Sequence, residues 1–187
     1  DAAVQVILDF NDVTGVEISD KAVKLCSEKF GINAHSPKDF LANKLDKDYD
    51  LITLWHVYEH VYTVDEYFEL FSESLAEGGA LILALPNLTS KDAAMFKEFW
   101  AAYDTPRHLW HFSPNTLELL ANNKGFTLER KYKLPLDPFF NSMVSASYMK
   151  KFTFLPFTIL KGLWSFTLSL FNIDKSSSLI YVLRKTT

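Results

Sequence analysis

The sequence predicts an α/β protein with a doubly wound, mostly parallel sheet that carries helices on both faces. Two observations predict this class. Short apolar, β-branched runs alternate with stretches of helical periodicity, and near-continuous apolar runs are typical of strands buried on both sides of a parallel sheet. The chain has 187 residues, of which 48% are hydrophobic, and this is enough to bury one core. A single domain over residues 1–187 is therefore expected.

The expected elements follow in chain order. Strands are predicted at Val4–Phe10, Val13–Ile18, Asp50–Trp55, Ala80–Leu85, Phe126–Tyr132 and Ser178–Arg184, the last of them antiparallel to its neighbours. Helices are predicted at Ser19–Phe30, Val64–Ala76 and Thr116–Asn123. We expect Ser19 to cap the first helix and Gly78-Gly79 to close the second, because such residues mark helix ends.

Residues 137–173, between the last two strands, are expected to form an apolar helical insertion or lid. Its apolar part, Phe152–Phe171, is interrupted by Pro156 and carries Lys161 near its middle. A bilayer span needs ~20 apolar residues, and a central lysine costs ~2.5–3.5 kcal/mol on insertion. Polar residues recur in one narrow stripe at helical spacing. We therefore expect a helix that is mostly buried or lies on an apolar surface. The stripe consists of Thr158, Lys161, Ser165, Ser169 and Asn172.

Composition excludes some partners. A net charge of −4 leaves no electrostatic footprint for nucleic acid. The single cysteine, Cys26, cannot form an internal disulfide, so a reducing cytoplasm is expected. The first residues lack the basic-then-apolar pattern of a secretion signal.

Functional side chains in such a sheet lie at the carboxyl ends of the strands. The run Val13–Glu17 ends in a carboxylate. Its two oxygens could accept both hydroxyls of a ribose. The alternative is that Glu17 only caps the following helix.

Four segments carry a family resemblance. They are Val13–Asp20 (VTGVEISD), Tyr49–Val61 (YDLITLWHVYEHV), Glu77–Asn87 (EGGALILALPN) and Phe99–Ser113 (FWAAYDTPRHLWHFS). Together they resemble bacterial class I S-adenosylmethionine (SAM)-dependent methyltransferases related to the quinone O-methyltransferases, and the last segment is the most specific. The resemblance implies a Rossmann-like fold with SAM as cofactor. Glu17 would bind its ribose, Ile18 would contact its adenine, and Trp55 and His56 would line its methionine end.

The glycine-rich cofactor loop of that family has no counterpart in the sequence. The family has a first strand ending in L-D-[apolar]-G-x-G-x-G, and Ile7–Phe10 matches only the strand end, because no G-x-G occurs among the 187 residues. Either the loop and the first helix are missing between Phe10 and Asn11, or Ala2–Phe10 is the tail of that helix and the chain starts after the loop.

The segment His56-Val-Tyr-Glu59-His60 permits more than one interpretation. It resembles the H-x-x-E-H pattern of zinc peptidases, which needs both histidines on one continuous helix. A buried strand runs directly into His56, so a strand-to-loop turn is expected instead. Some quinone methyltransferases bind a divalent ion at a related E-x-x-E-H. We expect that no metal is bound and that Glu59 and His60 shape the loop through hydrogen bonds.

The segment Tyr103–Phe112 is expected to be a loop on the acceptor side, because loops at this edge of the sheet commonly bind substrate. Tyr103 and Arg107 are expected to contact the substrate. His108 or His111 is expected to be the general base, since imidazole titrates near working pH. The alternative is that Arg107 pairs with Asp104 and that the histidines only pack.

The combined interpretation is a cytoplasmic or membrane-peripheral enzyme that moves the SAM methyl group to a small acceptor, apolar or lipid-like, at oxygen. A methyltransferase-like binding domain without its cofactor loop is the alternative, and an NAD or nucleotide-sugar enzyme ranks third. The segment Phe152–Phe171 is expected to cover the acceptor pocket. Its apolar side chains would be buried in the protein's own core, against a homodimer partner or at a membrane interface.

Overall fold

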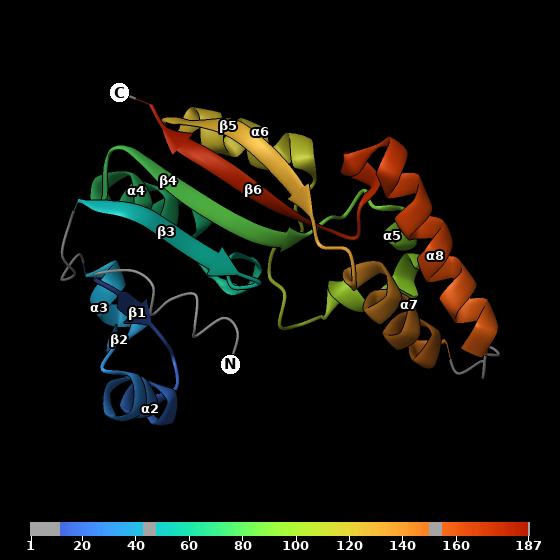
Figure 1. The fold of residues 1–187 in the computed structure, drawn as a ribbon, viewed down its shortest axis with the longest axis horizontal. Helices are drawn as coiled ribbons and strands as arrows, with labels where there is room; N and C mark the ends of the chain where they lie inside the picture. The colour runs from blue at the N-terminus through green and yellow to red at the C-terminus, as the bar shows by residue number, and fades with distance from the viewer. Residues whose placement is uncertain (1–11, 43–47, 150–154, 187) are drawn as a thin grey trace. The chain divides into compact units, whose positions relative to one another are not determined.

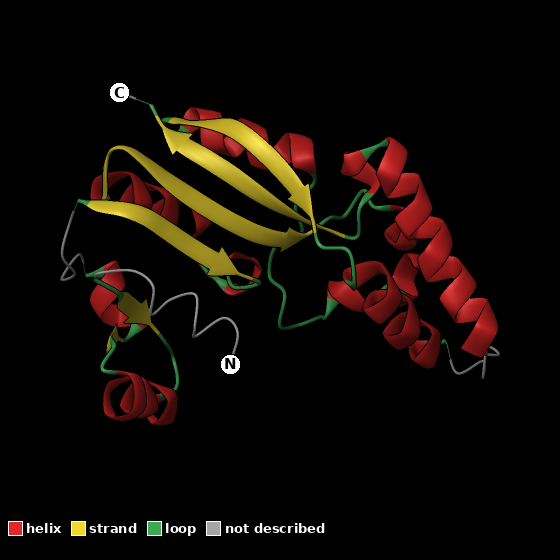
Figure 2. Cartoon of the chain, viewed as in Figure 1, coloured by secondary structure: helices red, strands yellow, loops and turns green. Residues whose placement is uncertain are grey.

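The computed structural model describes residues 12–42, 48–149 and 155–186, and the chain divides into two compact units, Asp1–Asp46 and Lys47–Thr187. Figure 2 shows the helices and strands of both units. The predicted strand Val4–Phe10 and the site of the expected cofactor loop lie outside the described residues.

The N-terminal unit contains one parallel strand pair and two helices (Figure 1). Strand β1 (Thr14–Val16) pairs with β2 (Asn33–His35), and helix α2 (Asp20–Phe30) connects them. Helix α3 (Pro37–Leu41) follows β2. The predicted helix after β1 is thus confirmed, and Ser19 stands at its N-cap position as predicted. The side chain of Ser19 makes no capping bond, and Oε1 of Glu17 accepts the Ser19 amide instead, at 2.8 Å.

The C-terminal unit contains a four-stranded sheet in the order β3-β4-β6-β5 (Figure 1). Its strands are β3 (Tyr49–Trp55), β4 (Leu75–Pro86), β5 (Phe126–Lys133) and β6 (Ser178–Lys185). β3 and β4 are parallel, and β6 runs antiparallel to both β4 and β5. The expected antiparallel last strand is therefore confirmed.

Two helices, α4 (Val64–Ser74) and α6 (Pro114–Asn123), lie behind this sheet in Figure 1. Their apolar side chains form the core with β5, because Phe68 of α4 meets Phe126 with ring centroids 5.6 Å apart and Leu117 of α6 is fully buried. Ser113 caps α6 in a reciprocal capping box, so the helix begins earlier than the sequence predicted.

The predicted end of the helix at 64–76 is wrong. The helix stops at Ser74, and β4 already includes Gly78-Gly79. A Cβ atom on Gly79 would lie 3.1 Å from the carbonyl oxygen of Tyr49 on the neighbouring strand and 2.9 Å from that of Ala76. The glycine therefore allows close strand approach and does not close a helix.

The predicted helical insertion before the last strand is confirmed. It consists of α7 (Asp137–Tyr148), α8 (Leu155–Phe171) and the short 3-10 helix η4 (Ile173–Lys175), and α7 and α8 lie side by side in Figure 1. Their closest approach is at Gly162, where a Cβ atom would lie 2.9 Å from Cδ1 of Phe139. Three short helices, α5 (Lys91–Phe96), η2 (Lys97–Phe99) and η3 (Ala101–Tyr103), complete this end of the unit. Within the described parts of the chain, every helix is too short or too polar to cross a bilayer.

Candidate active site

The chain turns sharply where β3 ends. The amide of His56 still donates to the carbonyl of Ala84 on β4, at 3.0 Å, but His56 itself has φ 53, in the left-handed region that non-glycine residues seldom adopt. A short 3-10 helix, η1 (Tyr58–His60), follows. His56 and His60 therefore do not share a continuous helix, and the prediction of a strand-to-loop turn is confirmed.

Tyr58 anchors this turn in the core. Its ring is fully buried and stacks on Phe112, with centroids 5.4 Å apart, and its hydroxyl donates to the carbonyl of Val64 at 2.7 Å. Burial raises the pKa of Tyr58 well above its usual range, so the phenol stays protonated. The anchor fixes the positions of Glu59 and His60, the residues that follow it.

The loop between η3 and α6 is docked onto this turn. The amides of Leu109 and Trp110 donate to the carbonyl of Glu59, at 2.8 and 3.2 Å. Nδ1 of His60 donates to the carbonyl of Arg107, at 2.9 Å. The turn after β3 and the distant Tyr103–Phe112 segment thus form one structure.

Glu59 is the buried centre of this structure. It is 1% exposed, and neither carboxylate oxygen has a hydrogen-bond partner among the described residues. Two imidazoles face Oε1: Nδ1 of His56 at 3.3 Å and Nε2 of His108 at 3.9 Å. The ring of His60 lies against that of His108, with centroids 4.6 Å apart. A buried carboxylate without hydrogen bonds is costly, and ionic contact with imidazole offsets this cost.

The pKa values of the two imidazoles beside Glu59 are shifted in opposite directions. The contact with Glu59 raises the pKa of His56, against the effect of partial burial, and Asp137 at 3.8 Å from Nε2 adds to the rise. Burial lowers the pKa of His108. Nδ1 of His108 must carry a proton, because it donates to the carbonyl of Ala102 at 2.8 Å. His108 is therefore neutral near pH 7, with its basic Nε2 directed toward Glu59 and Asp104.

Three of these side chains have the geometry that a divalent ion would require. One ligand atom each from Glu59, His60 and His108 lies within 4.8 Å of the others. Both histidines donate Nδ1–H to a backbone carbonyl, which leaves Nε2 as a ligand and is the usual second interaction of metal-bound histidine. The contact with Glu59 raises the pKa of His56, so a protonated His56 could balance the charge of Glu59 in place of an ion. The prediction that no metal is bound stays a prediction.

The other predicted acceptor residues lie at the edge of this cluster. The guanidinium of Arg107 donates to Oδ1 of Asp104 at 2.7 Å, which is the alternative considered for it from the sequence. Nε2 of His111 donates to the carbonyl of Tyr103 at 3.1 Å, and His111 is exposed. The structure thus brings His56, Glu59, His60 and His108 together, whereas Arg107, Tyr103 and His111 remain peripheral to them.

The predicted cofactor residues lie at the ends of β1 and β3, one pair in each unit. Glu17 follows β1 and is held by its bond to the Ser19 amide, and the side chain of Ile18 is 86% exposed. At the end of β3, Trp55 is 52% exposed. The roles of Glu17, Ile18, Trp55 and His56 in cofactor binding stay predictions.

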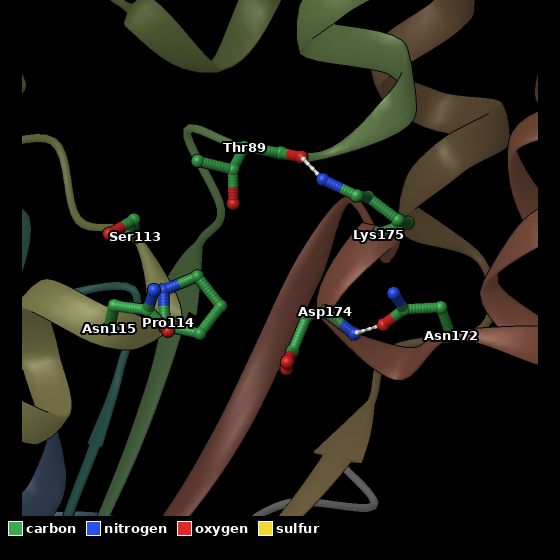
Figure 3. A pocket seen from close by; sticks show the side chains of 7 residues that line it. All are labelled: Thr89, Ser113, Pro114, Asn115, Asn172, Asp174 and Lys175. Carbon is green, nitrogen blue, oxygen red and sulfur yellow. Dashed lines mark hydrogen bonds between the residues drawn. The ribbon is translucent and has the colours of Figure 1, made fainter.

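A polar cleft of about 280 Å³ lies at the far side of the docked loop (Figure 3). The buried Asn87 organises the segments around it, since its Nδ2 donates to the carbonyls of Asp174 and Ser176 at 2.8 and 2.9 Å. The cleft contains none of the predicted site residues, and its walls offer no aromatic side chain. It is lined by Thr89, Ser113, Pro114, Asn115, Asn172, Asp174 and Lys175.

Sequence reasoning missed the central position of Glu59 and the structural role of Asn87. The H-x-x-E-H spacing drew attention to Glu59, but the expected bond between Glu59 and His60 does not form among the described contacts. His60 bonds to Arg107 instead. Burial of the carboxylate depends on the docked loop, which is distant in the chain and leaves no local signal.

Comparisons with known proteins identify the family and the fold of this chain. The family model of a methyltransferase domain, Methyltransf_23, matches residues 4–131, which is most of the chain. The search of curated proteins found no match.

Solved structures share the fold at low identity. A SAM-dependent methyltransferase from Archaeoglobus fulgidus is 17% identical with a TM-score of 0.55, over 92% of this chain and 75% of that one. Phosphoethanolamine N-methyltransferase 2 from Haemonchus contortus, in complex with SAM, is 15% identical with a TM-score of 0.59, over 98% and 45%. A cyclopropane synthase from Mycobacterium tuberculosis is 15% identical with a TM-score of 0.55, over 93% and 70%.

These neighbours confirm the Rossmann-like α/β class, with its mixed sheet and flanking helices. The family match supplies what the fold alone does not, because one fold serves many reactions. The chain therefore belongs to the methyltransferase-domain family, and it is a SAM-dependent methyltransferase.

Proposed function

We propose that this enzyme methylates an oxygen atom of a small apolar acceptor, as the resemblance to quinone O-methyltransferases implies, and that His108 is the general base. The observation that carries the proposal is the state of His108. Its Nδ1–H is engaged by Ala102, burial keeps the ring neutral, and Nε2 is directed toward the Glu59 carboxylate.

A base at this position favours oxygen over nitrogen as the methylated atom. A neutral amine attacks a methyl group with its own lone pair, whereas a hydroxyl becomes a good nucleophile only when its proton is removed. Bound SAM supplies the methyl group, whose bond to sulfur breaks as the bond to oxygen forms. Nε2 of His108 takes the hydroxyl proton, and Glu59 and Asp104, with oxygens 3.9 and 3.8 Å from Nε2, stabilise the imidazolium. Tyr103 and Arg107 would contact the acceptor from the adjoining loop.

Apolar side chains exposed near the cluster support an apolar acceptor. They come from the turn after β3 and from the docked loop, the same two segments that hold the histidines. Exposed apolar groups around a few convergent polar ones are typical of small-molecule sites. They are Trp55, Val57, Tyr62, Leu109 and Trp110.

The test uses SAM labelled in its methyl group and pairs of aromatic acceptors that have the same shape but carry either a hydroxyl or an amino group. The expected product is the labelled methyl ether, identified by mass spectrometry, with little transfer to the matched amine. His108→Gln should abolish most of the ether formation. Transfer to the amines alone, or ether formation undiminished in His108→Gln, would contradict the proposal.

A further inference from the structure

Helix α8 is amphipathic, but its polar side faces the protein and its apolar side faces outward. Its polar side chains Thr158, Ser165 and Ser169 point into the protein and are 3%, 0% and 4% exposed. Six of its apolar side chains are exposed. A helix at the surface of a soluble domain normally buries its apolar stripe, so this orientation requires a specific cause.

The cause is a buried polar network on the inner side of the helix. Asp92 is fully buried and accepts hydrogen bonds from Nε1 of Trp100 at 2.9 Å and from Oγ of Ser177 at 2.6 Å, and Oγ of Ser165 on α8 approaches its other oxygen at 3.4 Å. Close contact at Gly162 seats α8 on α7. The polar face is thus directed inward, because rotating α8 would remove Ser165 from Oδ1 of Asp92, and the loss of a hydrogen bond to a buried carboxylate oxygen is costly.

The outer face of α8 is apolar apart from Thr167 and carries no charge. Six apolar residues, spaced three to four apart or adjacent, fall on one side of the helix, and each is about half exposed or more. Contiguous apolar surface of this kind on a soluble protein marks a site of interaction. The residues are Ile159, Leu160, Leu163, Trp164, Leu170 and Phe171, and we refer to them as the outer face of α8.

The distribution of charged residues along the chain indicates which kind of partner covers the outer face of α8. The insertion Asp137–Lys175 contains four basic and two acidic residues, whereas the rest of the chain contains fifteen basic and twenty-one acidic residues. A second copy docked face to face would bring two positive segments together, which is unfavourable. An anionic lipid surface is attracted to the insertion and repelled by the rest of the chain.

We propose that the outer face of α8 docks the enzyme on an anionic membrane surface, with the helix lying in the plane of the interface. At 17 residues α8 is too short to span the bilayer, and its uncharged face is of the kind that inserts at the boundary of headgroups and acyl chains. Trp164 belongs to that face and is 56% exposed, and tryptophan is favoured at this depth. The inference does not depend on which atom the enzyme methylates.

The test is sedimentation with vesicles made of equal parts phosphatidylglycerol and phosphatidylcholine, compared with vesicles of phosphatidylcholine alone. We expect wild type to bind the anionic vesicles, with binding that weakens as salt is added. The double variant Leu160→Glu, Trp164→Glu should bind at least about tenfold more weakly. The matched control is Leu119→Glu, because Leu119 on α6 is 62% exposed and lies outside the outer face. Leu170→Glu provides an independent variant if the double variant does not fold.

Light scattering on the same proteins shows whether a second copy of the chain, and not a membrane, covers the outer face of α8. If wild type is a dimer that the double variant converts to monomer, while vesicle binding is absent or equal in all variants, the face is a dimer interface and the proposal is overturned. Failure of wild type to bind anionic vesicles also overturns it. Monomeric wild type that binds vesicles through this face supports it.

Discussion

Nε2 of His108 lies 3.9 Å from Oε1 of Glu59, although the two residues belong to loops that are far apart in the chain. The pair joins a buried carboxylate to an imidazole that burial keeps neutral. Such a pair can hold a proton transiently, because the carboxylate stabilises the imidazolium once it forms. In the proposed mechanism Glu59 is a positioning residue for His108 and does not itself need to touch the acceptor.

Replacing Glu59 by Gln should lower turnover while SAM affinity stays near wild type. The carboxylate favours the protonated form of His108, so its loss should lower the pKa of His108 further. The acidic limb of the pH–rate profile should therefore move to lower pH. The control is Glu98→Gln, an exposed site on η2. A fall in turnover with no movement of that limb would mean that Glu59 only holds the loop in place.

Protonation of His56 should stabilise the fold at low pH. The pKa of His56 is raised in the folded state, chiefly by Glu59, so its stabilising effect is fully present below the unfolded value of 6.5 and is lost as pH rises through the folded pKa. Urea unfolding should show a difference between wild type and His56→Gln that is larger at pH 5.5 than at pH 8.5. A difference that is independent of pH would show that His56 contributes no charge interaction.

Glu17→Ala should weaken SAM binding to the full-length protein by more than tenfold, about 1.4 kcal/mol. Glu17 stands at the end of β1, where a carboxylate can accept ribose hydroxyls. It also accepts the amide of Ser19, and Glu17→Gln preserves this bond, so that variant separates the two roles. Equal affinity of wild type and Glu17→Ala, by calorimetry, would remove Glu17 from the cofactor site.

Chelation should leave methyl transfer unchanged. The contact with Glu59, 3.3 Å away, raises the pKa of His56, so protonation of this imidazole can balance the carboxylate without a cation. Dialysis against EDTA, followed by assay with and without added Zn²⁺ or Mg²⁺, measures this directly. Loss of activity that one of these ions restores, in wild type but not in His60→Asn, would instead establish a metal centre at Glu59, His60 and His108.

Much of the fold could be predicted from the sequence because the strands of a covered sheet are short, apolar and locally encoded. β3 and β6 agree with prediction to within a residue or two. The helix ahead of β4 was predicted too long, because glycines that permit close strand packing resemble those that end helices. The strand predicted at Val4–Phe10 remains a prediction.

The site could be predicted only in part. His56 and His108 were predicted as site residues, since the first follows a strand and the second lies in a distinctive motif. Glu59 was expected only to shape the loop. Their contact depends on hydrogen bonds between backbone groups of the docked loop and the turn after β3, and such bonds have no sequence signature. The orientation of α8 was also hidden, because a polar stripe on an apolar helix indicates a face but not which side is buried.

The most direct test of the role proposed for His108 is a comparison of SAM affinity with turnover in His108→Gln. His108 is proposed as the base on the acceptor side. In His108→Gln, turnover should therefore fall by about 10²-fold or more, while the SAM dissociation constant stays within about twofold of wild type. His111→Gln alters an exposed neighbour that hydrogen-bonds to the Tyr103 carbonyl and whose ring lies near those of Tyr103 and His108, and this variant should retain most of its turnover. If His108→Gln instead loses SAM binding and methyl transfer in parallel, or keeps wild-type turnover, His108 is not the base.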